Sequence, residues 1–355
     1  MLKVCITVDT EFSIAGAFAH STWLPIAEQR VLCMVGKKSQ GLGFMLDCFS
    51  RHQVKASFFV ESLNRRYFKH DPMRPIAEQL HAAGHEVQLH VHPCWDVFQH
   101  ADWRERARMP MSPGIDDFYG RSEDDSLRLI ESAMEVFDDW KVPTPTAFRS
   151  GNLRHDDTLY KAIARAGIPY ASNVGAAIYD CGDPRYQLYS GRHLRHGVVE
   201  CPLLSFRDFS FAGSPKLKSL TITGSSFAET RLMLEQAYSM GIEEVVILTH
   251  PFEFVQSQGV RLHNMRPNRL NRARLEKLCA YLAANRGRFQ TTGVAEAAAA
   301  PLTPDSERNL LLKGKLSTSL PRAVAQVCYD QYGKWQMARS SRSAPFIHEE
   351  AVLTE

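Results

Sequence analysis

Two pairs of side chains at alternating positions in the sequence could bind a metal ion. Asp9 and Glu11 follow a short apolar run, and an extended chain would point both carboxylates to the same side. His90 and His92 have the same spacing at the end of another apolar run, so their imidazoles would also share one face. Histidine and carboxylate sets with open coordination positions suit hydrolytic or oxidative metals. The ordinary alternatives are two solvated acids at a strand end and a histidine pair that binds no metal.

Polar residues also follow two later apolar runs. Arg149 precedes a Ser-Gly-Asn sequence at 150–152, and His250 follows the run 245–249. In parallel α/β proteins, ligands bind at the carboxyl ends of the strands, so these residues and the two pairs above would converge there. Taken alone, Arg149 would be a surface or ion-pair residue, and His250 a hydrogen-bonded histidine beside a proline.

The elements that must position these residues alternate between short apolar runs and amphipathic segments. This alternation predicts an α/β fold with βα units around a parallel sheet or barrel. Helical spacing of apolar residues, with capping and stop residues, predicts helices over 122–140, 226–240 and 268–285. The expected strands lie near 4–8, 55–60, 86–92, 146–149, 169–173, 198–201, 245–249 and 288–292.

Length and composition limit the class of protein. The 355 residues allow one or two domains, and 44% hydrophobic with 23% charged residues is typical of a globular chain with a sizeable core. The 42 Lys and Arg residues against 39 Asp and Glu leave a net charge of +3. Without a basic cluster, neither nucleic acid nor an anionic membrane is an expected partner.

The ends and the cysteines favour a cytoplasmic protein. A carboxylate follows the first apolar residues before a signal-peptide core could form, and the sequence has no uncharged apolar stretch of 18 residues. The eight cysteines contain no CxxC pair, which fits reduced, buried thiols. We therefore predict no secretion signal, no membrane span and a cytoplasmic location.

A change in composition near 297–301 divides the chain into two parts. We predict a barrel over 1–300 and a C-terminal extension over 301–355 that is partly helical or mobile. An amphipathic helix is expected around 322–331, and the Ser/Arg-rich stretch 338–343 is expected to be mobile. Two long connections, 12–41 and 94–120, either line a substrate mouth or form packed surface loops.

The order of five motifs resembles the NodB-like polysaccharide deacetylases, carbohydrate esterase family 4, over roughly residues 3–296. The resemblance implies a distorted (β/α)7-type barrel of the glycoside hydrolase/deacetylase kind. The motifs are Thr7-Val8-Asp9-Thr10-Glu11, Ala56-Ser57-Phe58-Phe59-Val60, Gly84-His85-Glu86-Val87-x-x-His90, Phe148-Arg149 and Ile247-Leu248-Thr249-His250.

The resemblance also implies a metal site. Glu11 takes the place of the metal-binding acid, and His90 matches the first metal histidine. The family's second histidine lies four residues further on, where this sequence has Cys94, so His92 is the expected substitute. The implied cofactor is a divalent metal, with Zn first and Co, Mn or Ni as alternatives. The sequence leaves open whether His92 or Cys94 completes the site.

Catalytic roles carry over in the same way. The resemblance implies that Asp9 is the general base, that Arg149 orients it, and that His250 is the general acid. Amines leave only when protonated, so an ionised Asp9 and a protonated His250 predict a bell-shaped pH profile. We expect substrate contacts, including a backbone oxyanion donor, from Ser150, Gly151, Asn152 and Trp95.

The implied activity is that of a hydrolase acting on carbon–nitrogen bonds other than peptide bonds. It would remove an N-acetyl or N-formyl group from an amino sugar in polysaccharide or surface-glycan biosynthesis. The substrate would be a small-molecule or lipid-linked sugar, and a homo-oligomer is allowed. Two alternatives stay open: an amidohydrolase of a small non-sugar amide or ureide, and a degenerate, non-catalytic barrel that binds glycan.

Overall fold

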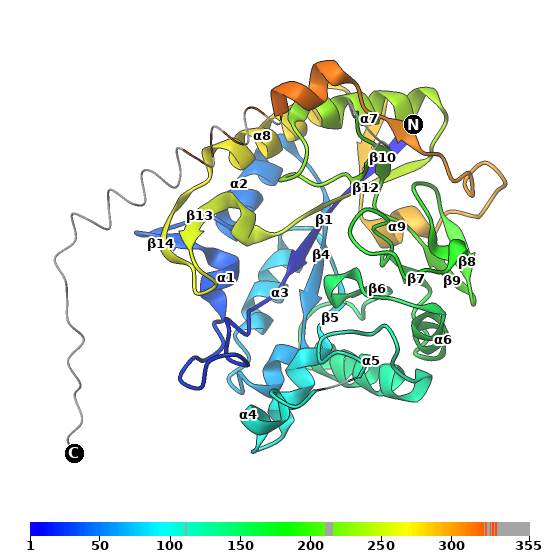
Figure 1. The fold of residues 1–355 in the computed structure, drawn as a ribbon. Coiled ribbons are helices and arrows are strands. Elements are labelled where there is room, and N and C mark those ends of the chain that lie inside the picture. Colours follow the sequence, from blue (N-terminus) through cyan, green and yellow to red (C-terminus); the bar gives the residue numbers. More distant parts are fainter. Residues whose placement is uncertain are drawn as a thin grey trace.

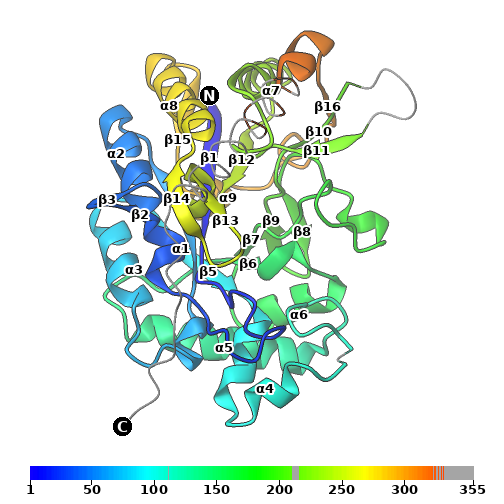
Figure 2. The same cartoon turned by 60° about the vertical axis from the view of Figure 1, so that its left-hand side comes forward.

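The computed structural model describes residues 1–110, 112–209, 216–322, 324, 327, 329 and 331. Within these residues the chain forms a curled sheet surrounded by helices (Figures 1 and 2). Neighbouring strands follow the order β12-β1-β4-β5-β6-β7-β9-β8, and β15 also pairs with β1. In chain order these strands are β1 (Leu2–Thr10), β4 (Ala56–Glu61), β5 (Glu86–Val91), β6 (Ala147–Ser150), β7 (Tyr170–Ala171), β8 (His193–Arg195), β9 (Val198–Glu200), β12 (Glu244–Thr249) and β15 (Phe289–Thr291).

The sheet is parallel from β12 to β9, and it closes irregularly. Only β8 runs antiparallel among the sheet strands described. On the far side of β12, isolated parallel bridges join Leu203 to Val246 and Thr221 to Leu248. All eight expected strands are present. The architecture confirms the predicted distorted barrel, and the isolated bridges to β12 form an irregular seam.

Helices cover the outside of the strands. The predicted helices are α5 (Glu123–Asp138), α7 (Phe227–Ser239) and α8 (Arg269–Ala284). The hydroxyl of Ser122 accepts the Asp125 N–H at the start of α5, and Ser226 with Glu229 forms a capping box on α7. The other helices are α1 (Glu28–Leu32), α2 (Leu42–His52), α3 (Met73–Ala82), α4 (Trp103–Arg106), α6 (Asp157–Arg165) and α9 (Val294–Ala298).

Short elements complete the chain. The small strands are β2 (Met34–Val35), β3 (Lys38–Ser39), β10 (Ser205–Arg207), β11 (Leu217–Ser219), β13 (Val255–Gln258), β14 (His263–Pro267) and β16 (Leu312–Lys313). The 3-10 turns are η1 (Leu63–Arg66), η2 (Pro93–Gln99), η3 (Gly151–Leu153), η4 (Pro184–Tyr186) and η5 (Pro251–Phe254). The η3 turn directly follows β6, whereas η2 and η5 follow β5 and β12 after one residue each, His92 and His250.

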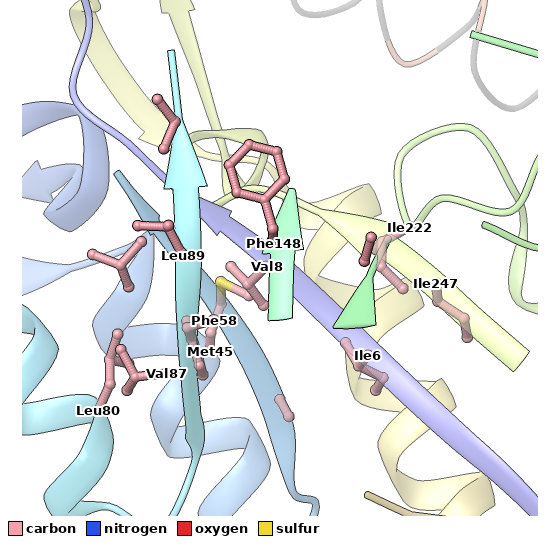
Figure 3. Packing of buried hydrophobic residues seen from close by; sticks show 14 of the residues in the cluster. Ile6, Val8, Met45, Phe58, Leu80, Val87, Leu89, Phe148, Ile222 and Ile247 are labelled. Atoms are coloured by element: carbon pink, nitrogen blue, oxygen red, sulfur yellow. The ribbon is translucent and has the colours of Figure 1, made fainter. Parts of the chain in front are cut away.

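The two faces of each strand enter different cores. Even-numbered residues of β1, such as Ile6 and Val8, belong to the main core cluster, which also contains Met45 of α2 and Leu80 of α3 (Figure 3). Cys5, on the odd-numbered face, belongs to a smaller cluster inside the barrel. Because successive strand residues alternate between faces, the odd-numbered face of β1 carries Asp9 toward the barrel interior.

The chain beyond residue 300 contacts the barrel where it is described. Strand β16 pairs in parallel with β10, and the Arg322 guanidinium lies 3.0 Å from the carboxylates of Asp208 and Glu229. The helix expected around 322–331 falls partly outside the described residues, and the stretch 338–343 falls wholly outside them. None of the helices described is long and apolar enough to cross a membrane.

Candidate functional site

Strand parity and register bring the predicted residues to one end of the barrel interior. His90 of β5 is in register with Glu61 of β4 and with Arg149 of β6. Glu11 and His250 follow directly after β1 and β12, which pair along six residues. A cavity of about 420 Å³ opens at this end. Its lining includes Asp9, Glu11, His90, His92 and His250.

Glu11, His90 and His92 form one ligand cluster. Glu11 Oε2 lies 3.3 Å from His90 Nε2 and 2.7 Å from His92 Nε2. The candidate ligand atoms of all three residues lie within 4.8 Å of one another. Cys94 is outside this cluster, because its thiol lies on the other side of His92 beside Asp116. Burial and then Asp116 hold the pKa of Cys94 well above its usual range, which keeps the thiol protonated.

In both imidazoles, the Nδ1 atom, which faces away from Glu11, already has a hydrogen-bond partner. His90 Nδ1 lies 2.9 Å from the backbone carbonyl oxygen of Arg149, which can only accept, so Nδ1 carries the proton and Nε2 faces Glu11. His92 Nδ1 lies 2.8 Å from Asp116 Oδ2. Metal-binding histidines almost always donate their other N–H to a carbonyl or a carboxylate in this way.

Protonation of His92 compensates the charge of this cluster. Burial alone would lower the pKa of His92, but the carboxylates of Asp116 and Glu11 raise it well above its usual range. Burial likewise would raise the pKa of Glu11, but His92, His90 and Arg30 hold it well below its usual range. A divalent cation can replace the imidazolium proton among the same atoms. The donor set, its orientation and its charge therefore fit a divalent metal.

Arg149 holds Asp9 in a fixed position. The guanidinium is fully buried, and its Nη1 donates to Asp9 Oδ1 at 2.7 Å and to the Thr7 hydroxyl at 2.9 Å. Nε and Nη2 donate to the carbonyl and the hydroxyl of Ser172, at 2.9 and 2.8 Å. Burial would raise the pKa of Asp9, but Arg149, His90 and His250 together lower it below its usual value. Asp9 is therefore an ionised carboxylate at neutral pH.

His250 approaches the other oxygen of Asp9. Its Nε2 lies 3.8 Å from Asp9 Oδ2, and its Nδ1 lies 3.1 Å from Glu253 Oε1 in the η5 turn. Burial would lower the pKa of His250, but Glu253, Asp9 and Glu11 raise it to about 9. The imidazole is therefore cationic at neutral pH and presents Nε2–H to the cavity.

Of the four residues expected to contact substrate, three do not line the cavity. Trp95 is only 1% exposed, because it packs in the core against Phe68 and Phe98. Ser150 is buried, and its N–H donates to the Asn173 side chain and is not free for an oxyanion. Gly151 is also buried, but Asn152 does line the cavity.

Gly151 has a spatial role instead. A Cβ atom at this position would lie 2.5 Å from Nδ1 of His92. The glycine therefore leaves space for the His92 imidazole. Its absent side chain affects the position of a ligand of the cluster and not a substrate contact.

Sequence reasoning did not identify several residues around the site. Arg30 donates to Glu11 at 3.2 Å and Asp116 contacts His92, so each of the two long connections contributes one partner. Both connections therefore reach the ligand cluster, but only 94–120, through Asp117, also lines the cavity. Glu253 could have been found from its three-residue spacing after His250. The cavity lining also includes Arg154 and Tyr179, for which the sequence carries no evident signal.

Comparisons with known proteins bear on the fold. No protein-family model matches the sequence, and no curated protein does. A solved structure described as "putative polysaccharide deacetylase from Mycobacterium smegmatis" is 18% identical, with a TM-score of 0.52. The match covers 89% of this chain and 95% of that one. The structure of Puue allantoinase is 13% identical over 85% of this chain and 92% of that one, with a TM-score of 0.46. The chain thus has the barrel fold of that deacetylase structure, as the order of its motifs implied.

Proposed function

We propose that this chain is a metal-dependent hydrolase that removes an N-acetyl or N-formyl group from an amino sugar. The observation that carries the proposal is the arrangement around one cavity of an ionised Asp9, a cationic His250 and the Glu11–His90–His92 cluster. Hydrolysis of an amide needs a base for the attacking water and an acid for the departing amine. The site offers both, next to a ligand set for a divalent ion.

Glu11, His90 and His92 would hold the ion, with Asp116 and the Arg149 carbonyl orienting the two imidazoles. We propose zinc, since two imidazoles and one carboxylate are ligands that it accepts readily. When bound, the ion supplies Lewis-acid polarisation of the acyl carbonyl and lowers the pKa of a water molecule. The remaining work falls to the side chains of the protein.

Asp9 accepts the first proton. As the water oxygen adds to the acyl carbon, one water proton moves to Asp9 Oδ2, the oxygen not held by Arg149 Nη1. Arg149 stabilises the carboxylate before the reaction and fixes its orientation through its bonds to Thr7 and Ser172. Asp9 therefore reaches the substrate ready to act as a base.

His250 supplies the second proton. The carbon–nitrogen bond breaks as Nε2–H of His250 protonates the amine nitrogen, and the products are a carboxylic acid and a free amino sugar. Glu253 holds Nδ1 and stabilises the imidazolium, so the proton stays on His250 until the amine leaves. Asp9 then releases its proton to solvent, and His250 takes up a proton from solvent, which restores the starting state.

The lining of the cavity supports a sugar substrate. Tyr179 offers an aromatic ring, and the Arg154 guanidinium lies 4.7 Å from the centre of that ring. Asn152 adds an amide for hydroxyl groups. The Arg154 guanidinium pairs with Asp117 of the same lining at 3.5 Å, and its remaining N–H groups suit the phosphate of a nucleotide- or lipid-linked sugar of polysaccharide or surface-glycan biosynthesis. A cytoplasmic location and a homo-oligomer stay predictions.

Release of acetate or formate tests the proposal. Purified protein loaded with zinc, cobalt or manganese is assayed against N-acetylated nucleotide sugars, lipid-linked amino sugars and small ureides. We expect turnover of an amino sugar that falls by about 10²–10⁴-fold in Asp9→Asn. Turnover of ureides alone would identify an amidohydrolase, and glycan binding without any turnover in the loaded protein would identify a non-catalytic barrel.

A further inference from the structure

A second group of metal-ligand residues lies on the outer helices. Cys48 and His52 are four residues apart on α2, and Glu276 and Cys279 are three residues apart on α8, so each pair shares one helix face. The two helices lie side by side (Figures 1 and 2). Candidate ligand atoms of Cys48, His52 and Glu276 lie within 4.8 Å of one another. None of these four residues lines the cavity of the proposed active site.

The side chains of this group lie close together. His52 Nε2 lies 3.2 Å from Glu276 Oε1. The Cys48 thiol lies within 4.8 Å of ligand atoms of both residues, and the buried Cys279 thiol lies beside Cys48. Thiol, imidazole and carboxylate groups from two helices thus share one small volume.

The chemistry of these groups selects a class of ion. Thiolate and imidazole ligands favour zinc and similar transition metals, whereas magnesium and calcium prefer oxygen ligands alone. Three protein ligands with a fourth nearby agree with the four-coordinate geometry that zinc adopts.

The competing explanation is a surface ion pair over two packed thiols. Arg51 contacts Glu276, and an arginine there would satisfy the carboxylate without a metal. The Arg51 side chain, however, is 56% exposed and can turn into water when a cation takes its place. An entry path also exists, because His52 lines an open hollow of about 220 Å³ together with Met1, Leu282 and Arg286. A metal site needs such a path as well as suitable ligands.

We propose that Cys48, His52 and Glu276 bind one zinc-class cation that joins α2 to α8, with Cys279 as the nearest further ligand. Binding releases the thiol proton of Cys48 to solvent, and the thiolate forms the metal–sulfur bond. The site is separate from the proposed active site and does not depend on the deacetylase activity. Its role would be structural, since it links two helices of the outer layer.

The test uses the full chain with the other ligand cluster removed. In a His90→Ala/His92→Ala variant, Cys48, His52 and Glu276 are the remaining converging metal-ligand group among the described residues. We expect the reduced, purified variant to retain about one zinc per chain, the number that a single site holds. Adding His52→Ala or Cys48→Ala should abolish that zinc. Because His52 is partly exposed, its variant should fold even if loss of the buried Cys48 thiol destabilises the chain.

Cobalt substitution reports on the sulfur ligand. In the same background, Co²⁺ should produce a thiolate-to-metal absorption band in the near ultraviolet that Cys48→Ala removes. Cys181→Ser is the matched control, because Cys181 lies outside the cluster and should leave the band and the zinc content unchanged. Zinc content that is unaffected by folded His52→Ala, or cobalt binding without a thiolate band, would overturn the proposal.

Discussion

The Nε2 atom of His250 lies 3.8 Å from Oδ2 of Asp9, while Arg149 occupies Oδ1 of the same carboxylate. Asp9 is therefore held between a permanent cation on one side and a titratable cation on the other. This arrangement separates the two oxygens into one that is anchored and one that faces the acid. The predictions below follow from this relationship and from the cluster beside it.

Asp9→Asn removes the base without removing a proposed metal ligand. We expect kcat to fall by about 10²–10⁴-fold, the usual contribution of a general base. Zinc content measured by elemental analysis should not change. A variant that retains full turnover would show that Asp9 is not the base, whereas one that loses zinc would show that Asp9 belongs to the metal site.

The pH profile should be limited on its alkaline side by His250. Its pKa is raised to about 9, so the proton needed by the amine is present at neutral pH and is lost as the pH rises through about 9. Asp9 has a lowered pKa and stays ionised into the acid range. We therefore expect kcat to fall above pH 9, measured with zinc at saturation.

Glu253→Gln tests the origin of that alkaline limit. Glu253 is the main group that raises the pKa of His250, and glutamine keeps an oxygen acceptor but removes the charge. Loss of an adjacent charge should move the alkaline limit downward by about 1–3 pH units. An unchanged limit would assign it to a different group.

Asp116 should control metal affinity rather than chemistry. It orients His92 through a 2.8 Å contact to Nδ1, and loss of such a partner typically costs about 10–100-fold in metal affinity or activity. Asp116→Asn should therefore weaken zinc binding in competition with a chelator, while kcat at saturating zinc changes less. Asp117→Asn is the matched control for zinc affinity alone, because Asp117 lines the cavity but pairs with Arg154 and not with His92.

Gly151→Ala should displace His92 by steric contact. The added Cβ would lie 2.5 Å from the imidazole, and crowding of a packed site costs about 1–3 kcal/mol. We expect a lower free energy of unfolding together with weaker zinc binding. Gly287→Ala is the control, since a Cβ there meets no atom within 4 Å. Zinc binding at wild-type strength in Gly151→Ala would contradict the spatial role of this glycine.

Local sequence patterns were enough to predict the strands and the face of each strand on which a side chain lies. Alternation of side chains along β1 and β5 predicted that Asp9 would share a face with Glu11, and His90 with His92. Contacts made by loops were not predictable in this way, because no periodicity relates Asp116 or Arg30 to the strand ends they reach. Trp95 was misplaced for the same reason: its sequence position beside the histidines does not reveal that its ring points into the core. The irregular seam through Leu203 and Thr221 also lacks a pattern, since single bridges require no apolar run.

Arg30 and Asp116 come from the two long connections, and both contact residues of the Glu11–His90–His92 cluster. A divalent ion on this cluster attracts Asp116 but repels the Arg30 guanidinium. Ion binding and the order of the connection 94–120 are therefore thermodynamically linked, because the ion stabilises the conformation in which Asp116 holds His92. Metal occupancy would then be readable from outside the site, as slower hydrogen exchange or proteolysis in 94–120. Substrate would meet an ordered cavity entrance only in the metal-bound protein. The ion would therefore control substrate entry as well as the reaction.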